Sequence, residues 1–323
     1  MEEKVSIIIP VYCSENTIEK CVKSLIRGTY SNIEIILIED CSSDNSWEIC
    51  EKLRNQYSCV RAYRNSKNSG PSATRNRGLQ IMTGKYLMFI DSDDWVESSF
   101  VSDFVNAYQK YHPGMIVAGY INHDEVQNAT ASYFGWGSAE LITIKNLKNE
   151  LVSMYHGRLL QQIWNKLFVA EIVKKNNLSF DTEIQIGEDF RFLLAYLEHI
   201  SSDKLVQINK PLYHYIRGNE NSLMAQFGRE KLDESLENLK RMYTFLGMCE
   251  TKKTKQLMED REAQLELWAY LIMHNIGMRK KEKKKMILAL DEKKGQKLYR
   301  NSKILYCKEQ IMVFIKRVLL LRD

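Results

Sequence analysis

The chain has 323 residues, of which 44% are apolar and 27% charged, and its formal net charge is +5. These values are typical of a globular protein with a sizeable core, built as one large domain with an accessory region or as two domains. No apolar run approaches the roughly 20 residues of a bilayer-spanning helix, and "MEEKVSIIIPVY" opens on acidic residues, so we expect neither a membrane span nor a signal peptide.

The first 91 residues predict a regular alternation of strands and helices. Apolar, often β-branched runs predict buried strands over residues 5–12, 33–40, 60–65 and 85–91. Helices are predicted within residues 14–30, 41–57 and 69–84. We expect Ser14 or Asn16 to cap the first helix and Ser43 or Asp44 to cap the second. This order of elements is typical of βαβ units, so we predict an α/β fold with a mostly parallel sheet flanked by helices.

The pattern is weaker beyond Trp95. Strands are expected over residues 115–122, at the start of 141–155 and from residue 211. Helices are expected in the rest of 141–155, within 161–180 and over 187–200. From about Lys231 onwards the sequence predicts charged helices. We therefore divide the chain into a domain of residues 1–228, with halves 1–100 and 101–228, and an α-helical, basic C-terminal region of residues 229–323.

Cysteine usage and charge distribution indicate the compartment and the partners. The seven cysteines form no CxxC pair, which predicts free thiols in a reducing compartment. Residues 279–323 contain 15 Lys or Arg against 5 Asp or Glu. Residues 302–323 predict a basic amphipathic helix, which suits an anionic membrane surface and equally suits packing on the rest of the protein or on a second subunit. Nucleic acid is a poorer partner, because aromatic residues are not interleaved with the basic ones.

Three carboxylates directly follow the fourth predicted strand, within "KYLMFIDSDDWVE" (residues 85–97). Asp91, Asp93 and Asp94 would lie at the carboxyl-terminal edge of the sheet, where open α/β sheets bind ligands and where Asp40 also falls. Like charges this close need compensation, which a divalent cation shared with a phosphate supplies. This pattern favours a Mg²⁺ or Mn²⁺ site over a simple turn or helix cap.

Two other kinds of phosphate chemistry fit the sequence less well. Phosphatases of the haloacid dehalogenase type place their two Asp residues on an early strand and follow them with a small pair such as Gly-Thr, whereas Asp94-Trp95 follows here. The segment "GPSATRNRG" has no Lys-Ser/Thr pair and is not a Walker phosphate loop. Its Arg75 and Arg77 are either surface residues or donors to a diphosphate.

Three segments, taken together and in this order, resemble the family-2 glycosyltransferases with the GT-A fold. They are "VSIIIPVYCSENTIEKCVKSLIRGTYSNIEIILIEDCSSDNS", "NSGPSATRNRGL" and "GKYLMFIDSDDW". The resemblance is strong over about residues 4–100, extends more weakly through "WNKLF", "GED" and "YHY" to about residue 224, and stops there. It implies a Rossmann-like GT-A domain that binds a nucleotide-diphospho-sugar, commonly UDP-linked, across the strand ends.

The resemblance also implies roles for individual residues on the donor side. The loop that packs on the nucleoside is matched by Pro10, Val11, Tyr12 and Glu15. Asp40 matches the residue that contacts the base, and Arg75 matches an Arg near the nucleotide. The metal and ribose motif is matched by Asp91, Ser92 and Asp93, with Asp93 as the direct metal ligand and Asp91 as a support or ribose contact. Glu39 stands where many relatives have Asp.

The catalytic base of the family is matched by Asp189 in "GED". A carboxylate there would take the proton from an acceptor hydroxyl as it attacks the anomeric carbon opposite the diphosphate, with inversion. An acidic residue in the first turn of a helix is the alternative for the Glu188-Asp189 pair. His214 matches a contact to the metal or the diphosphate, or is a packed histidine. Trp164 and Lys166 either line the donor site or serve the core and the surface.

These expectations describe a metal-dependent, inverting glycosyltransferase that uses Mn²⁺ or Mg²⁺. Its acceptor would be a hydroxyl of a glycan, a lipid-linked or a protein-linked substrate in bacterial surface polysaccharide or glycoprotein biosynthesis. We expect it in the cytoplasm, near the inner face of the membrane, with homo-oligomerisation left open. The alternatives are a sugar nucleotidyltransferase, for which "IPVYCSENT" lacks the expected glycines, and a non-catalytic partner subunit, for which Asp93 and Asp189 have no use.

Overall fold

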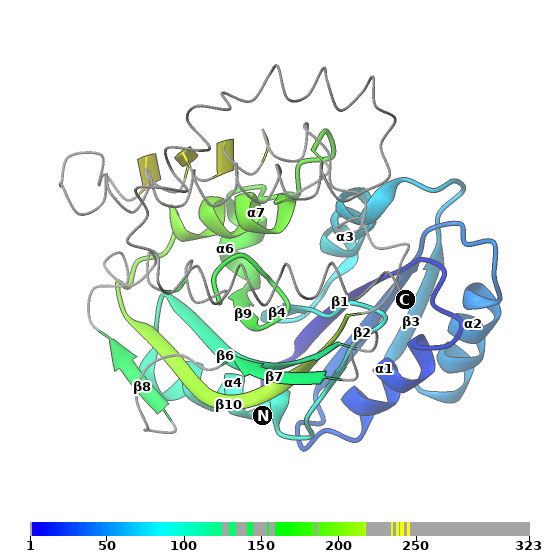
Figure 1. The fold of residues 1–323 in the computed structure, drawn as a ribbon, viewed down its shortest axis with the longest axis horizontal. Coiled ribbons are helices and arrows are strands. Elements are labelled where there is room, and N and C mark those ends of the chain that lie inside the picture. Colours follow the sequence, from blue (N-terminus) through cyan, green and yellow to red (C-terminus); the bar gives the residue numbers. More distant parts are fainter. Residues whose placement is uncertain are drawn as a thin grey trace, which may run out of the picture. The chain divides into compact units, whose positions relative to one another are not determined.

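The computed structural model describes residues 2–124, 129–133, 141–144, 154, 159–184 and 187–217, together with positions 234, 237, 238, 240, 241, 244 and 245 (Figure 1). The chain divides into two compact units, Met1–Glu220 and Asn221–Asp323. The first unit holds every residue of the predicted site. The predicted amphipathic helix at residues 302–323 and the predicted helix after residue 144 lie outside the described residues, apart from residue 154.

Four parallel strands form the first half of the sheet. They are β1 (Val5–Val11), β2 (Ile33–Glu39), β3 (Val60–Arg64) and β4 (Tyr86–Phe89), in the order β3-β2-β1-β4. Val5 lies opposite Ile33 on one side and Tyr86 on the other. Side chains on both faces of β1 are buried, as expected for a central parallel strand covered on both sides.

Helices cover both faces of this half-sheet. In Figure 1, α1 (Ile18–Ile26) and α2 (Ser46–Gln56) lie on one face, and α3 (Gly70–Ile81) lies on the other. A Cβ atom at Gly78 would come within 2.5 Å of the Ile8 side chain, so glycine allows α3 to approach β1 closely. The three helices predicted within residues 14–84 are all present, which confirms the βαβ organisation of this half.

The second half of the sheet is largely antiparallel. It contains β5 (Trp95–Val96), β6 (Met115–Asp124), β7 (Ala129–Tyr133), β8 (Leu141–Ile144), β9 (Lys166–Val169) and β10 (Leu205–Arg217). β9 joins the two halves, because it pairs antiparallel with both β4 and β6. β10 runs parallel to β6 and antiparallel to β5 and β8. The parallel arrangement predicted from the sequence thus holds for β1–β4 and for the β6–β10 pair.

Three local predictions differ from the structure. The N-caps of α1 and α2 are Thr17 and Asn45, each a residue or more beyond the expected caps. Asp44 accepts a hydrogen bond from the Ser46 amide and so forms a turn before the helix. Residues 166–169 form a strand within 161–180, where no strand was predicted, because four residues are too few to show a period of two.

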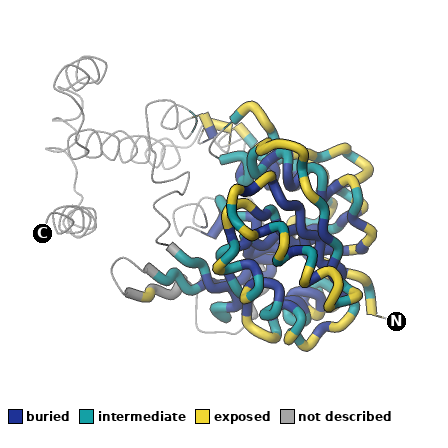
Figure 2. Tube along the Cα trace, turned by 90° about the vertical axis from the view of Figure 1, so that its right-hand side faces the viewer, coloured by how far each residue is buried: buried dark blue, intermediate teal, exposed yellow. Residues whose placement is uncertain are grey.

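An aromatic cluster packs α7 (Glu188–Leu197) against the sheet. Phe89 of β4 contacts Phe168, Phe180 and Phe192 edge-on, at centroid distances of 5.2–5.8 Å, and Phe180 stacks on Phe192 at 4.3 Å. Figure 2 shows buried segments running through the interior of this unit, with exposed segments at its periphery. The cluster fixes α7 so that its first turn lies near the end of β4. The described residues also form the helices α4 (Phe100–Tyr111) and α6 (Ala170–Lys175).

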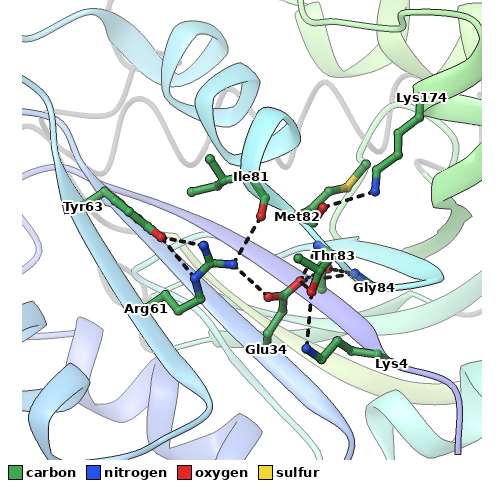
Figure 3. Close-up of polar contacts among 10 residues, drawn as sticks. Lys4, Glu34, Arg61, Tyr63, Ile81, Met82, Thr83, Gly84 and Lys174 are labelled. Atoms are coloured by element: carbon green, nitrogen blue, oxygen red, sulfur yellow. Dashed lines mark hydrogen bonds and ion pairs between the residues drawn. The ribbon is translucent and has the colours of Figure 1, made fainter.

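A buried carboxylate holds together the opposite edge of the sheet, at the amino-terminal ends of β1, β2 and β4 (Figure 3). Glu34, only 4% exposed, accepts hydrogen bonds from the Ser6 hydroxyl, from the amide and hydroxyl of Thr83, and from Arg61. Its Oε1 also accepts a bond from the Gly84 amide at 3.2 Å. Burial alone would raise the pKa of Glu34, but these donors outweigh it and lower the pKa.

Replacing Glu34 with Gln is expected to lower the free energy of unfolding by about 2 to 3 kcal/mol at pH 7, because the amide brings a donor among donors. Since the folded-state pKa is lowered, the contribution of the carboxylate is complete above its unfolded pKa and is lost as the pH falls below about 4. Urea-induced unfolding at pH 7 and pH 3.5 measures both effects. The partly exposed Glu51, which pairs with Arg54 at 3.3 Å, supplies the control Glu51→Gln, with an effect of about 0.5 kcal/mol or less. Equal losses in the two variants would contradict the assignment.

Within the described residues, no helix is long and apolar enough to cross a membrane.

Candidate active site

The carboxyl ends of β1, β2 and β4 bring the predicted donor-side residues to one edge of the sheet. Pro10 and Val11 end β1, and Tyr12 follows them with 51% of its surface exposed. An exposed ring beside a buried strand is suited to stacking on a flat ligand. Glu15 accepts hydrogen bonds from the amide and side chain of Asn45, which ties this loop to the start of α2.

Asp40 lies at the end of β2 and is buried. Its Oδ1 accepts hydrogen bonds from the Asn65 side chain and the Ser69 amide, and its Oδ2 accepts one from the Gly70 amide at 2.7 Å. Asp40 therefore binds the amino-terminal end of α3, a role that the sequence did not suggest. Its contact with a nucleobase stays a prediction. The neighbouring Glu39 accepts a hydrogen bond from the Ser42 amide and pairs with Arg64 at 2.9 Å.

Residues 91–94 form a turn after β4, which we call the 91–94 turn. The Ser92 hydroxyl shares a hydrogen bond of 2.7 Å with the Ser14 hydroxyl, so the turn is tied to the loop after β1. Asp91 and Asp93 are half-buried, whereas Asp94 is 1% exposed. Asp94 accepts hydrogen bonds from the Tyr213 hydroxyl and from the Ile216 amide, both of β10. Asp94 thus links the turn to a strand that lies more than 100 positions further along the chain.

Arg75 connects the acidic residues of the site. It is 5% exposed and projects from α3 between three carboxylates. Its Nη2 donates to Oδ1 of Asp91 at 3.0 Å, and its Nη1 lies 3.3 Å from Glu188 and 3.1 Å from Asp189. These charges outweigh the effect of burial and raise the pKa of Arg75, so the guanidinium stays charged. One cation thus connects the predicted metal motif to the predicted base.

Asp189 has the environment of a general base. Burial raises its pKa to about 8; Arg75 opposes this rise, whereas Glu188 and Asp91 add to it. Among the described residues, its buried Oδ1 has no hydrogen-bond donor, although the Arg75 guanidinium lies at ion-pair distance. A carboxylate with this pKa and an unsatisfied acceptor atom can take a proton from a hydroxyl near neutral pH.

The 91–94 turn was also predicted to hold a divalent cation. In the part of the chain that the structure describes, no group of three or more His, Cys, Asp or Glu side chains is arranged to hold a metal ion unaided. Mg²⁺ and Mn²⁺ favour oxygen ligands, and Mg²⁺ typically takes one or two protein carboxylates and completes its shell with phosphate oxygens and water. Asp91 and Asp93, two carboxylates on one turn, fit a cation that is bound together with a diphosphate.

The residues that the sequence left open have defined partners. His214 is buried, contacts Glu97 and His123 through its two ring nitrogens at 2.8 Å, and stacks on Trp95. This geometry is that of a packed histidine. Lys166 is fully buried and donates to the carbonyls of Leu159 and Gln162 and to the Asn165 side chain.

Trp164 completes an aromatic stack. It lies against Tyr213 with ring centroids 4.2 Å apart and an interplanar angle of 18°, and it is buried. Trp164 is thus the core residue that the structural alternative expected, whereas Lys166 is buried and is not the surface residue expected there. Sequence reasoning gave Tyr213 no role, although it is the first residue of the "YHY" segment, because only the histidine of that segment matched a contact to the metal or the diphosphate.

Comparisons with known proteins agree on one family. Residues 6–161 match the family model described as "Glycosyl transferase family 2". The chain is 33% identical over 224 residues to "Glycosyltransferase GlyA" of Streptococcus pneumoniae serotype 4, which covers 67% of this chain and 31% of GlyA. It is 30% identical over 233 residues to "Uncharacterized glycosyltransferase EpsJ" of Bacillus subtilis, which covers 72% of this chain and 66% of EpsJ. The chain therefore spans less than two thirds of each of these relatives.

The fold has a counterpart among solved structures. The crystal structure of S. aureus TarS 1–349 in complex with UDP-GlcNAc superposes with a TM-score of 0.65 at 18% identity, over 86% of this chain and 77% of that one. At this identity the likeness concerns the fold, which is the predicted GT-A arrangement of a curled, mixed sheet with flanking helices. With the family model, the relatives and the fold in agreement, the chain belongs to glycosyl transferase family 2.

Proposed function

We propose that this chain transfers a sugar from a nucleotide-diphospho-sugar to a hydroxyl group, with inversion at the anomeric carbon. The observation that carries the proposal is the single guanidinium of Arg75, which contacts Asp91 on the donor side and Asp189 on the other. One cation thus holds a donor-binding carboxylate close to a proton acceptor. This arrangement suits a reaction in which the hydroxyl of a bound acceptor displaces the nucleoside diphosphate from a bound donor.

Each side chain has a distinct task in this proposal. Tyr12 stacks on the nucleobase, and Asp189 removes the proton of the acceptor hydroxyl at its unsatisfied Oδ1. Arg75 keeps Asp189 and Asp91 at a fixed separation. Asp93 and Asp91 would hold Mn²⁺ or Mg²⁺, which, when bound, neutralises the charge of the leaving diphosphate.

We further propose a UDP-linked donor and an acceptor in bacterial surface polysaccharide or glycoprotein. Support for UDP comes from the similarly folded TarS, whose structure contains UDP-GlcNAc. Support for a glycan acceptor comes from a relative named "Poly(ribitol-phosphate) beta-glucosyltransferase" in Bacillus spizizenii, which is 28% identical over 260 residues. The proposal keeps the cytoplasmic location expected from the sequence, whereas membrane contact through residues 302–323 lies outside the described residues.

The nucleotide sugar is expected to bind only in the presence of the metal. In a thermal-shift panel of UDP-, GDP- and ADP-sugars with Mn²⁺, a UDP-sugar should raise the melting temperature by about 5 °C or more at about 100 times its Kd. Chelation with EDTA should remove the shift, as should Asp93→Asn. The control is Asp103→Asn, at a carboxylate in the first turn of α4, which should leave the shift unchanged. No shift with any nucleotide sugar, or an equal shift without metal, would contradict the proposal.

A further inference from the structure

We propose that Tyr213 is a positioning residue for the donor site, because its hydroxyl fixes the backbone of the 91–94 turn against β10. The inference rests on the proposed function and adds to it a residue of the "YHY" segment to which the sequence assigned no role. It concerns the placement of Asp91 and Asp93, not their chemistry.

The Tyr213 hydroxyl makes two hydrogen bonds to the same turn. It donates to Oδ2 of Asp94 at 2.5 Å and accepts from the backbone amide of Asp91 at 3.2 Å. The other oxygen of Asp94 accepts from the Ile216 amide at 2.7 Å. Both ends of the turn are thereby bonded to β10. The backbone amide of Asp91 bonds to the Tyr213 hydroxyl, and the carboxylate of Asp94 bonds to that hydroxyl and to the Ile216 amide.

The tyrosine ring is itself immobilised. Tyr213 is fully buried, its backbone lies opposite Val96 in the antiparallel β5–β10 pair, and its ring stacks on Trp164 at 4.2 Å. On another side the ring of Phe100 lies 6.1 Å away. A ring held by a strand and by two aromatic neighbours keeps its hydroxyl at one point. The hydroxyl therefore fixes the position of the turn relative to the second half of the sheet.

This anchoring opposes a force that the sequence makes evident. Asp91 and Asp93 carry like charges within three residues, and their repulsion favours opening of the turn. Without the hydroxyl, the Asp91 amide and one Asp94 oxygen each lose a buried partner. The turn would then relax, and a displacement of about 1 Å at a ligand-binding carboxylate weakens binding substantially.

The test compares two buried tyrosines. In Tyr213→Phe, the Kd values for Mn²⁺ and for the UDP-sugar that stabilises the wild type, measured by calorimetry, are expected to rise about tenfold or more. The matched control is Tyr196→Phe, since the Tyr196 hydroxyl also accepts a backbone amide, from Val169 at 3.1 Å, and the residue is also buried. Tyr196→Phe should change the melting temperature but leave both Kd values within about twofold.

A second variant, Asp94→Asn, tests the same link from its other end. It should raise both Kd values. The double variant with Tyr213→Phe should lose less binding free energy than the sum of the losses in the two single variants. If the wild-type protein binds the donor, and Tyr213→Phe and Asp94→Asn have the same Kd values as the Tyr196→Phe control, this inference alone is overturned. Absence of donor binding by the wild-type protein would overturn the proposed function and the inference with it.

Discussion

Asp189→Asn is expected to reduce sugar transfer by about 10²- to 10⁴-fold while donor binding persists, because an amide cannot accept the proton of the acceptor hydroxyl. Asn preserves the size of the side chain and removes its basicity. Measured with a UDP-sugar and an acceptor glycan, the loss should appear in kcat, with the KM for the donor nearly unchanged. A variant that retained full transfer activity would exclude Asp189 as the base.

The pH dependence provides a signature specific to Asp189. Burial raises its pKa to about 8, and the charged groups that face it are Arg75, Glu188, Asp91 and Lys166. Since the base acts when deprotonated, kcat/KM of the wild type should rise with pH and level off above about 8. The Asn variant should lose this rise along with its activity.

The melting temperature of Asp189→Asn distinguishes a catalytic role of Asp189 from a role as a stabilising acid at the start of a helix. A carboxyl whose folded-state pKa is raised destabilises the fold as it ionises, so Asp189→Asn should not lower the melting temperature at pH 8. Asp103, also in the first turn of a helix and 3.5 Å from Lys210, supplies the comparison. Asp103→Asn should lower the melting temperature slightly and leave transfer intact, which is the reverse of the pattern expected for Asp189→Asn.

The first half of the fold was predictable because its signals are local. Val5–Val11 and Ile33–Glu39 are mostly apolar, with Ser6, Glu34 and Glu39 as the polar exceptions, and the helices between the strands show apolar residues at helical spacing. Parallel strands place their carboxyl ends at one edge, so the grouping of Tyr12, Asp40 and Asp91 also followed from the sequence. The resemblance to a family then selected these residues from other polar ones.

The second half was less predictable, for reasons of length and distance. β5 and β9 contain two and four residues, too few to show a period, yet β9 joins the two halves of the sheet. The contact of Arg75 with Glu188 spans 113 positions, and that of Tyr213 with Asp94 spans 119. Such pairs arise from the path of the whole chain, so motif spacing could suggest the individual residues but not their meeting.

The second large effect is expected at Arg75, where loss of one cation leaves three neighbouring carboxylates without their shared partner. Arg75→Met should lower the free energy of unfolding by about 3 to 5 kcal/mol at pH 8. Arg75→Lys should recover only part of this, since one ammonium cannot reproduce the two separate contacts of the guanidinium fork. Urea-induced unfolding measures both losses.

Charge, and not lost packing, should account for the effect of Arg75→Met. Arg77→Met is the matched control on the same helix, since Arg77 donates to the Arg64 carbonyl and the Asn65 side chain and to no carboxylate among its described hydrogen bonds. Its loss should be less than half as large.

Adding Glu188→Gln to Arg75→Met should restore stability, because it removes one of the repelling charges. Arg75 opposes the rise in the pKa of Asp189, so without it that pKa should rise further, and the deficit of Arg75→Met should shrink from pH 8 to pH 5 as Asp189 takes up its proton. A deficit that is independent of pH and unrelieved by Glu188→Gln would mean that the Arg75 side chain acts through its packing, and that the carboxylates on either side of it are held apart by the fold alone.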